Sequence, residues 1–153
     1  MEQKIRELLD QKGHDVVCVP PRTLVRDAVR SMNDLHIGSV LVMEERRLLG
    51  IFTERDVLRR IVEGRRDPDT TRVGDVMTRE LVTVSPELES GRTMRVMTRQ
   101  KVRHLPVVEH GRLIGLVSLG DLAWFVTQGL EEEVGDLTRY IYGPHATPLD
   151  LRP

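Results

Sequence analysis

The sequence predicts an α/β (α+β) fold in which two copies of one β-α-β-β-α unit pack as a pseudo-two-fold pair. Residues 17–62 align with residues 82–127 without a gap, at an offset of 65 positions, with eleven identities in 46 pairs. Both copies end with Gly, two apolar residues, Thr or Ser, two variable residues and Asp, at residues 50–56 and 115–121. The predicted strands are short and nearly all apolar, as in sheets that helices cover. With only two copies, we expect a pair that buries a shared face rather than a solenoid.

The first half alternates apolar runs with segments of helical periodicity. Ile5, Leu8 and Leu9 share one face of a short helix that Gly13 ends. Thr23 is placed to cap the helix that follows the first strand. The predicted elements are a helix over residues 3–12, a strand over 16–19, a helix over 23–35, strands over 40–43 and 48–52, and a helix over 53–62.

A polar segment containing Gly64 and Pro68 separates the halves. The predicted elements after it are a helical turn over 73–77, a strand over 81–84, a helix over 88–99, strands over 105–108 and 113–117, and helices over 118–129 and 131–142. The predicted domains are an N-terminal helix (1–13), repeat one (14–63), a linker (64–73), repeat two (74–128), and a C-terminal helix with a loose tail (129–153).

Composition limits the classes of function. The formal net charge of −1 and the few aromatic residues make nucleic-acid binding unlikely. No nucleotide-hydrolase glycine loop, nucleophile elbow or metal-ligand spacing is present, so neither an enzyme nor a metal site is expected. No apolar run is long enough to span a membrane, and no signal peptide is evident, which predicts a soluble cytoplasmic protein. The single cysteine, Cys18, is expected to be buried and inert.

The repeated hydroxyl-to-Asp motif has two interpretations. A hydroxyl residue followed three positions later by an acid is close to a capping box, although that box normally uses Glu or Gln. Alternatively, a helix N-terminus can hold a phosphate, and a nearby carboxylate can accept hydrogen bonds from a ribose diol. The motif occurs in both copies, at Thr53 with Asp56 and at Ser118 with Asp121. This repetition favours the nucleotide interpretation.

The order of elements, the repeated motif and the run Val102–Val108 together resemble a tandem pair of cystathionine-β-synthase (CBS) domains, or Bateman module. The resemblance covers about residues 8–128 and is closest to stand-alone CBS-pair proteins. Such modules typically bind adenosine derivatives (AMP, ADP, ATP, NAD(H) or S-adenosylmethionine) between the repeats and often form disc-like dimers. The resemblance implies an adenosine nucleotide as regulatory ligand, with no catalytic cofactor.

The resemblance also implies which residues bind the ligand. Asp56 and Asp121 match the ribose-binding Asp, and Thr53 and Ser118 match its hydroxyl partner. Arg103 and His104 match a basic pair that reaches phosphate across the cleft, and they would complete one site with Thr53 and Asp56. Arg55 either contacts phosphate in the same site or is an exposed surface residue. The second site would place Ser118 and Asp121 opposite Gly38 and Ser39, which supply no cation. The two sites are therefore expected to differ. The first is expected to prefer a phosphorylated ligand, and the second to be weak, empty or suited to an adenosine with less charge.

Two functions follow. The first is a regulatory module that senses an adenine nucleotide and transmits its binding to an unidentified protein partner, with a homodimer formed through CBS–CBS packing. The alternative is a structural dimerisation or adaptor protein without a nucleotide ligand, in which the motifs only cap helices. The segment after residue 128, outside the repeats, is where a partner site is expected.

Overall fold

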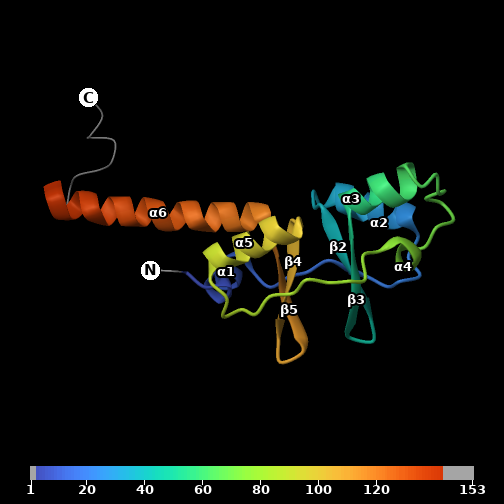
Figure 1. Cartoon of the computed structure of the whole chain (residues 1–153), viewed down its shortest axis with the longest axis horizontal. Helices are drawn as coiled ribbons and strands as arrows, with labels where there is room; N and C mark the ends of the chain where they lie inside the picture. The colour runs from blue at the N-terminus through green and yellow to red at the C-terminus, as the bar shows by residue number, and fades with distance from the viewer. Residues whose placement is uncertain (1–2, 143–153) are drawn as a thin grey trace.

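In the computed structural model, which describes residues 3–142, two α/β halves lie side by side (Figure 1). In both halves helices lie on one side and the β-hairpins extend away from them (Figure 1). Each half has its own buried hydrophobic cluster. This arrangement confirms the predicted pair of mixed α/β units.

The first half contains a three-stranded sheet of order β1-β2-β3, with β1 parallel to β2 and β2 antiparallel to β3. Helix α2 buries Val25, Ala28 and Met32 in the core beneath it. The elements are β1 (Cys18–Val19), α2 (Val25–Asp34), β2 (Ser39–Glu44), β3 (Arg47–Thr53), the short helix α3 (Glu54–Asp56) and the π-helix η1 (Val57–Val62).

The second half repeats this plan with one loss. Strands β4 and β5 form an antiparallel hairpin, and the first strand of the unit is reduced to a single parallel bridge between Val84 and Val107. The hairpins of the two halves even share an irregularity at equivalent places, between Val42 and Met43 and between Val107 and Val108. The elements are α5 (Ser90–Gln100), β4 (His104–Glu109), β5 (Arg112–Ser118) and α6 (Leu119–Tyr142).

Each half is completed by the helix that precedes the other half. Helix α1 (Ile5–Lys12) buries Ile5, Leu8 and Leu9 in the core of the second half, next to α6 and β5. Helix α4 (Val73–Val76) packs into the core of the first half, where the amide of Ile51 donates to the carbonyl of Thr78 at 3.0 Å. The exchange is visible in Figure 1, where α1 lies beside α5 and β5, and α4 lies beyond β3. The two halves are therefore tied together by their own connecting segments.

Several local predictions were wrong. Helix α6 is continuous from Leu119 to Tyr142 and includes Gly129 and Gly135. The predicted break near Gly129 therefore does not occur. The strand predicted over 81–84 is only the bridge at Val84, and the helix predicted over 53–62 becomes a π-helix after Asp56. The predicted tail, 143–153, lies outside the described residues.

Two side chains also differ from their predicted roles. Leu24, not Thr23, is the N-cap of α2, and no side-chain hydrogen bond caps this helix. Cys18 is exposed rather than buried because strand β1 lies at the edge of its sheet, and its thiol lies 3.4 Å from the sulfur of Met43. Partial desolvation raises the pKa of the Cys18 thiol, which lowers the thiolate fraction.

Candidate functional site

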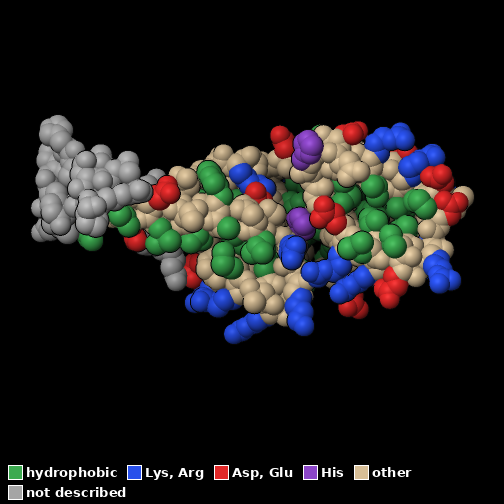
Figure 2. Space-filling view, turned by 90° about the horizontal axis from the view of Figure 1, so that it is seen from above, with side chains coloured by type: hydrophobic (Ala, Val, Ile, Leu, Met, Phe, Trp, Pro, Cys, Tyr) green, Lys and Arg blue, Asp and Glu red, His purple; other side chains and the backbone are tan. Residues whose placement is uncertain are grey.

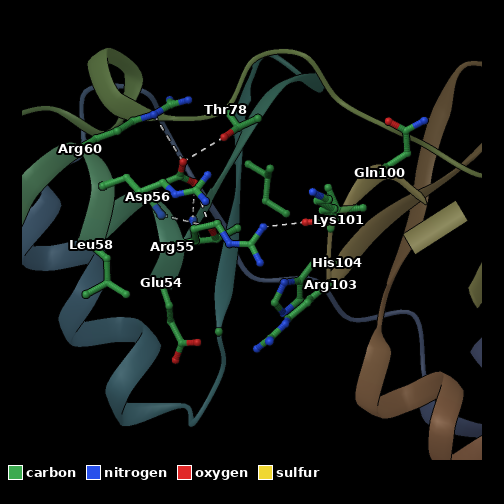
Figure 3. Close-up of a pocket in the computed structure, with 15 residues that line it drawn as sticks. Glu54, Arg55, Asp56, Leu58, Arg60, Thr78, Gln100, Lys101, Arg103 and His104 are labelled. Carbon is green, nitrogen blue, oxygen red and sulfur yellow. Dashed lines mark hydrogen bonds and ion pairs between the residues drawn. The ribbon is translucent and has the colours of Figure 1, made fainter. Parts of the chain in front are cut away.

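A cleft of about 630 Å³ lies between the two halves and is called the first cleft. One wall is the start of α3 and η1, and the other is the end of α5 with the start of β4 (Figure 3). Its volume lies within the range typical of small-molecule sites. It is lined by Gly38, Ile51, Thr53, Glu54, Arg55, Asp56, Leu58, Arg59, Arg60, Thr78, Gln100, Lys101, Val102, Arg103 and His104.

Thr53 and Asp56 form a reciprocal capping box at the start of α3. The Thr53 amide donates to Asp56 Oδ2 at 2.9 Å, and the Asp56 amide donates to Thr53 Oγ1 at 3.4 Å. The hydroxyl of Thr53 also donates to Oδ2, at 3.0 Å. The Asp side chain is long enough to close the box, so the capping interpretation of the motif is correct as a description of the local geometry.

The carboxylate of Asp56 has further neighbours. The hydroxyl of Thr78 donates to Oδ1 at 3.0 Å, and Arg60 Nε lies 3.6 Å from the same oxygen (Figure 3). Asp56 is only 6% exposed, so any ligand that hydrogen-bonds to this carboxylate must share it with these donors. Thr78 belongs to the segment after α4, and this segment therefore completes this side of the first cleft.

Basic side chains from both halves converge on the first cleft. Arg55 reaches across it, and its Nη1 donates to the carbonyl of Lys101 at 2.6 Å (Figure 3). Lys101 ends α5 in the left-handed conformation, with φ of 54°, which turns its carbonyl toward the first half. The lining residues include five cations, which are Arg55, Arg59, Arg60, Lys101 and Arg103. Against them stand the carboxylates of Glu54 and Asp56, so the cleft is electropositive.

His104 lies at the start of β4, next to Arg103 on the wall opposite Asp56 (Figure 3). Burial lowers the pKa of His104, and this effect outweighs the nearby carboxylates of Glu54 and Asp121, which act to raise it. The ring is therefore mainly neutral near pH 7. A Cβ at Gly38 would lie 3.2 Å from Glu54 Oε2 and 3.3 Å from His104 Cε1, so Gly38 leaves the room in which these side chains meet.

A second cleft of about 700 Å³ occupies the equivalent place on the other side of the pair. Its residues Ser118, Leu119, Gly120 and Ala123 stand 65 positions after first-cleft residues 53, 54, 55 and 58. The charge differs greatly, because Gly120 replaces Arg55 and Gly38 replaces Arg103. The complete lining is Met32, Asn33, His36, Ile37, Gly38, Glu54, Arg103, His104, Ser118, Leu119, Gly120 and Ala123.

Asp121 does not line the second cleft. It forms the same capping box as its counterpart, with the Ser118 amide donating to Oδ2 at 2.7 Å and the Asp121 amide donating to Ser118 Oγ at 3.1 Å. Lys12 Nζ of α1 lies 2.9 Å from the same Oδ2. Burial acts to raise the pKa of Asp121, but the hydrogen bonds from Lys12 and Ser118 outweigh burial and hold it below its usual value.

The structure thus brings together most of the predicted site residues. Gly38, Thr53, Arg55, Asp56, Arg103 and His104 share the first cleft, and Ser118 with Gly38 lines the second. Ser39 is buried and lines neither cleft, because it is paired with Thr53 in the β2–β3 ladder. Sequence reasoning missed Glu54, Thr78, Lys101 and Lys12. Of these, only Glu54 lies inside the repeated motif, at one of its variable positions.

The CBS-domain model matches residues 5–63 and 73–127 of the chain. The chain belongs to the CBS-domain family. It is a tandem CBS pair, and the exchange of α1 and α4 agrees with the match, which begins in α1 and resumes at α4. The resemblance inferred from the repeat, the motif and the run at residues 102–108 is thereby confirmed.

Stand-alone CBS proteins are among the relatives of this CBS pair. It is 43% identical over 124 residues to the mitochondrial CBS domain-containing protein CBSX3 of Arabidopsis thaliana, covering 78% of this chain and 60% of that protein. It is 34% identical over 126 residues to the CBS domain-containing protein YhcV of Bacillus subtilis, covering 82% of this chain and 88% of that protein. The chain thus spans less than two thirds of the plant relative and most of the bacterial one.

Solved CBS structures share the fold. A CBS-domain protein of Burkholderia ambifaria, assigned to signal transduction, matches with a TM-score of 0.80 and 36% identity, covering 82% of this chain and 95% of that one. A CBS-domain protein of Agrobacterium tumefaciens matches with a TM-score of 0.77 and 34% identity, covering 81% and 99%. These matches fix the architecture as that of a CBS pair.

Within residues 3–142, no helix is long and apolar enough to cross a bilayer. Over the same described part of the chain, no group of three or more His, Cys, Asp or Glu side chains is arranged to hold a metal ion.

Proposed function

We propose that this CBS pair is a regulatory module that binds an adenosine-containing nucleotide in the first cleft. The observation that carries the proposal is the gathering of five cationic side chains around one buried Asp between the halves. A polyanion placed there would neutralise cationic charges that otherwise repel one another across the cleft. CBS domains generally bind adenosine ligands, and the ligand of this chain is proposed on that basis together with the charge of the cleft.

The cleft has separate surfaces for the parts of a nucleotide. Ile51, Leu58 and Val102 supply apolar contacts for a purine ring. Thr53 and Asp56 stand at a helix start, where hydroxyl and carboxylate groups suit a ribose diol. We assign the ribose to this motif and the phosphates to the cations on the opposite wall.

Phosphate binding would act on both halves at once. Arg55 belongs to the first half and Lys101 and Arg103 to the second, and the hydrogen bond from Arg55 to the Lys101 carbonyl already crosses the cleft. A phosphate group is a stronger acceptor for a guanidinium than a backbone carbonyl is. Ligand binding would therefore exchange this contact for one made through the ligand, and the resulting shift between the halves is the proposed signal.

Calorimetric titration tests the proposal with AMP, ATP, NADH and S-adenosylmethionine in separate runs. We expect about one ligand per chain for one of them, and Arg103→Ala should weaken it roughly tenfold to a hundredfold by loss of a charge-assisted bond. Arg92→Ala is the matched control, because Arg92 lines neither cleft and pairs with Glu89 on α5. Absence of heat from all four ligands, with nothing co-purified by mass spectrometry, would refute the proposal.

The second candidate is a dimerisation or adaptor protein, which the complete capping boxes and an exposed apolar surface support. Figure 2 shows hydrophobic side chains on the helical side of both halves. Large apolar residues that are exposed at the C-terminal end of α2, on η1 and on α6 include Leu35, Leu58, Val62, Leu119 and Trp124. We propose that this helical face mediates a homodimer, which sedimentation analysis of Val62→Asp against wild type tests. A melting temperature that no nucleotide shifts would favour this candidate over the sensor.

Three further assignments belong to the proposal. Two of the relatives, CBSX3 and YhcV, are stand-alone CBS proteins, and we propose a non-catalytic role, which slow hydrolysis of saturating ATP would contradict. The cytoplasmic location stays a prediction, since the named compartment of the plant relative is mitochondrial. The domain boundaries predicted from the sequence are likewise kept as proposals, with the partner of the module placed on α6 beyond residue 128.

A further inference from the structure

We propose that Lys12 forms an ion pair with Asp121 and thereby closes the inner end of the second cleft, so that the chain binds one nucleotide instead of two. The inference rests on the proposed function of the first cleft and explains why the second cleft binds no second nucleotide. It assigns to helix α1 a role in ligand stoichiometry that the repeated motif by itself does not predict.

The closure is visible in what the two clefts contain. The outer part of each is built from equivalent residues, with His36, Ile37 and Gly38 of the second cleft standing 65 positions before Lys101, Val102 and Arg103 of the first. The inner part exists only in the first, where Ile51, Asp56 and Thr78 line it. Their counterparts around Asp121 do not line the second cleft. The second cleft therefore ends before it reaches its own carboxylate.

Helix α1 stands at that missing inner end. Its Leu9 packs against β5 so closely that a Cβ at Gly115 would lie 2.7 Å from Leu9 Cδ2. Lys12, one turn further on, places Nζ 2.9 Å from Asp121 Oδ2 with its side chain 25% exposed. His14 extends the attachment, with Nδ1 2.9 Å from the Ile114 carbonyl oxygen. The packing of Leu9 and the contact of His14 hold the lysine over the carboxylate.

In the first half, the segment equivalent to α1 brings no charge to its carboxylate, and Arg60 of η1 lies 3.6 Å from Asp56 Oδ1, beyond hydrogen-bond distance. Lys12 stands 65 positions before Met77, which is buried in the core of the first half. The donor that reaches Asp56 from that segment is the neutral hydroxyl of Thr78, at 3.0 Å from Oδ1. A ribose hydroxyl can share a carboxylate with another hydroxyl, whereas an ammonium group neutralises it and covers it. The difference between Met77 and Lys12 is thus a difference in access to the ribose position.

The contact lowers affinity in proportion to its occupancy. If the Lys12–Asp121 pair is formed in about 90% of molecules, the apparent affinity of the second cleft falls roughly tenfold. Of the five cations of the first cleft, only Arg103 also lines the second, and Gly120 and Gly38 stand at the positions equivalent to Arg55 and Arg103. Its intrinsic ligand is therefore an adenosine moiety of low charge, and free adenosine is the suitable probe.

The test is Lys12→Met, which installs the residue found at the equivalent position of the first half. AMP and adenosine are titrated into wild type and variant, and native mass spectrometry counts the ligands bound per chain. We expect wild type to bind about one AMP, and the variant to bind in addition about one adenosine that Lys12→Met/Asp121→Asn loses again. Lys4→Met is the matched control. It removes the same charge next to α1, but Lys4 pairs with Glu87 and lies outside both clefts.

The outcomes separate the two proposals. If wild type binds AMP once and Lys12→Met gains no second ligand, the closure by Lys12 is refuted while the first-cleft site stands. Two ligands on wild type would refute the closure as well. If wild type and both variants bind neither probe, the nucleotide site itself fails and the closure falls with it. Should Lys12→Met fail to show a cooperative thermal transition, Lys12→Gln keeps a polar end group without the charge and must show the same gain.

Discussion

The two clefts of this CBS pair share a backbone and differ in chemistry. At each, a strand ends in a hydroxyl residue whose oxygen caps a helix. Its backbone amide donates a hydrogen bond to the carboxylate of the Asp three residues later. Helices α2 and α5 also end alike, with His36 and Lys101 both in the left-handed conformation at φ of 53° and 54°. Yet the first cleft gathers five cations and the second holds Arg103 alone besides two histidines. Duplication has kept the geometry of the motif while single side chains set what each copy can bind.

The contrast extends to the segments that enter from outside each repeat. The segment after α4 brings a neutral hydroxyl, Thr78, to Asp56, and α1 brings a cation, Lys12, to Asp121. Both segments precede the half opposite to the one they complete, so the exchange places a separate control element at each carboxylate. Asymmetry between the clefts therefore arises as much from the connecting helices as from the repeated motif.

The largest expected difference is between the two Asp→Ala substitutions. Asp56→Ala removes acceptors for the Thr53 amide and hydroxyl and for Thr78, and leaves these partly buried donors without their partner. We expect it to lower the free energy of unfolding by about 3 kcal/mol, measured by urea denaturation. Asp121→Ala breaks a half-exposed ion pair and one cap, so about 1 kcal/mol is expected.

The same pair of variants distinguishes capping from ligand binding. Asp56→Ala should also weaken nucleotide binding roughly tenfold to a hundredfold, while Asp121→Ala leaves the one ligand of wild type unchanged. Asp56→Asn preserves the shape of the side chain and controls for unfolding. Equal nucleotide affinity in wild type, Asp56→Asn and Asp56→Ala would leave the motif with only its structural role.

The second comparison concerns the equivalent glycines of β3 and β5. A Cβ at Gly50 would lie 2.7 Å from the backbone carbonyl oxygen of Thr78, which cannot move without shifting the segment after α4. A Cβ at Gly115 meets the far end of the Leu9 side chain, which can change rotamer. We expect Gly50→Ala to cost about 2–3 kcal/mol and Gly115→Ala about 1 kcal/mol in thermal unfolding. Equal losses would mean that α1 and α4 yield to the same degree.

Much of this architecture is predictable because the sequence repeats. The offset of 65 residues aligns the hairpins, the helices and both capping motifs, and the resemblance built on them identifies the family. The capping geometry at Thr53 and Ser118 also follows from local spacing. What the repeat alone does not give is where a segment outside the alignment packs, and Lys12 and Thr78 belong to such segments.

Other features fail to follow from local sequence because tertiary contacts decide them. Gly129 predicts a helix end, yet α6 continues through it, and the glycine position lies close to Gln3, whose Oε1 would be 2.8 Å from an added Cβ. Ser39 stands beside Gly38 in sequence, but it begins β2, whose first four residues are all buried, and it is 4% exposed there. The hydrogen bond from Arg55 to the Lys101 carbonyl depends on the position of one half relative to the other.

A third comparison sets the exposed helix positions of the two repeats against each other. Helix α5 carries Gly91 where α2 carries Arg26, and a Cβ at Gly91 would meet nothing within 4 Å. Gly91→Ala should therefore stabilise the protein by about 0.5–1 kcal/mol through helix propensity, read from the melting temperature. The change lies far from both clefts, so nucleotide affinity should stay constant. If Gly91→Ala instead lowered the melting temperature, the added methyl group would have to meet a neighbour of α5, and the expectation would be wrong.

The smallest expected effect is a pH dependence of the first cleft that arises from His104, which lines both clefts. Burial lowers the pKa of His104 below 6.5. The carboxylates of Glu54 and Asp121 act to raise this pKa, whereas the cations of Arg103 and Lys12 lower it further. Below about pH 6.5 the unfolded chain binds more protons than the folded one, so stability falls as pH decreases through the folded pKa.

A bound phosphate reverses this preference for the neutral ring. Negative charge beside His104 favours its protonated form, so affinity for AMP should rise as pH falls through the same window, while affinity for adenosine should not. Urea unfolding and AMP titration of wild type and His104→Asn between about pH 5 and about pH 8 check both slopes. His104→Asn should flatten both. If AMP affinity keeps its pH dependence in that variant, the titrating group is the phosphate itself, and His104 contributes to the first cleft only as a neutral wall.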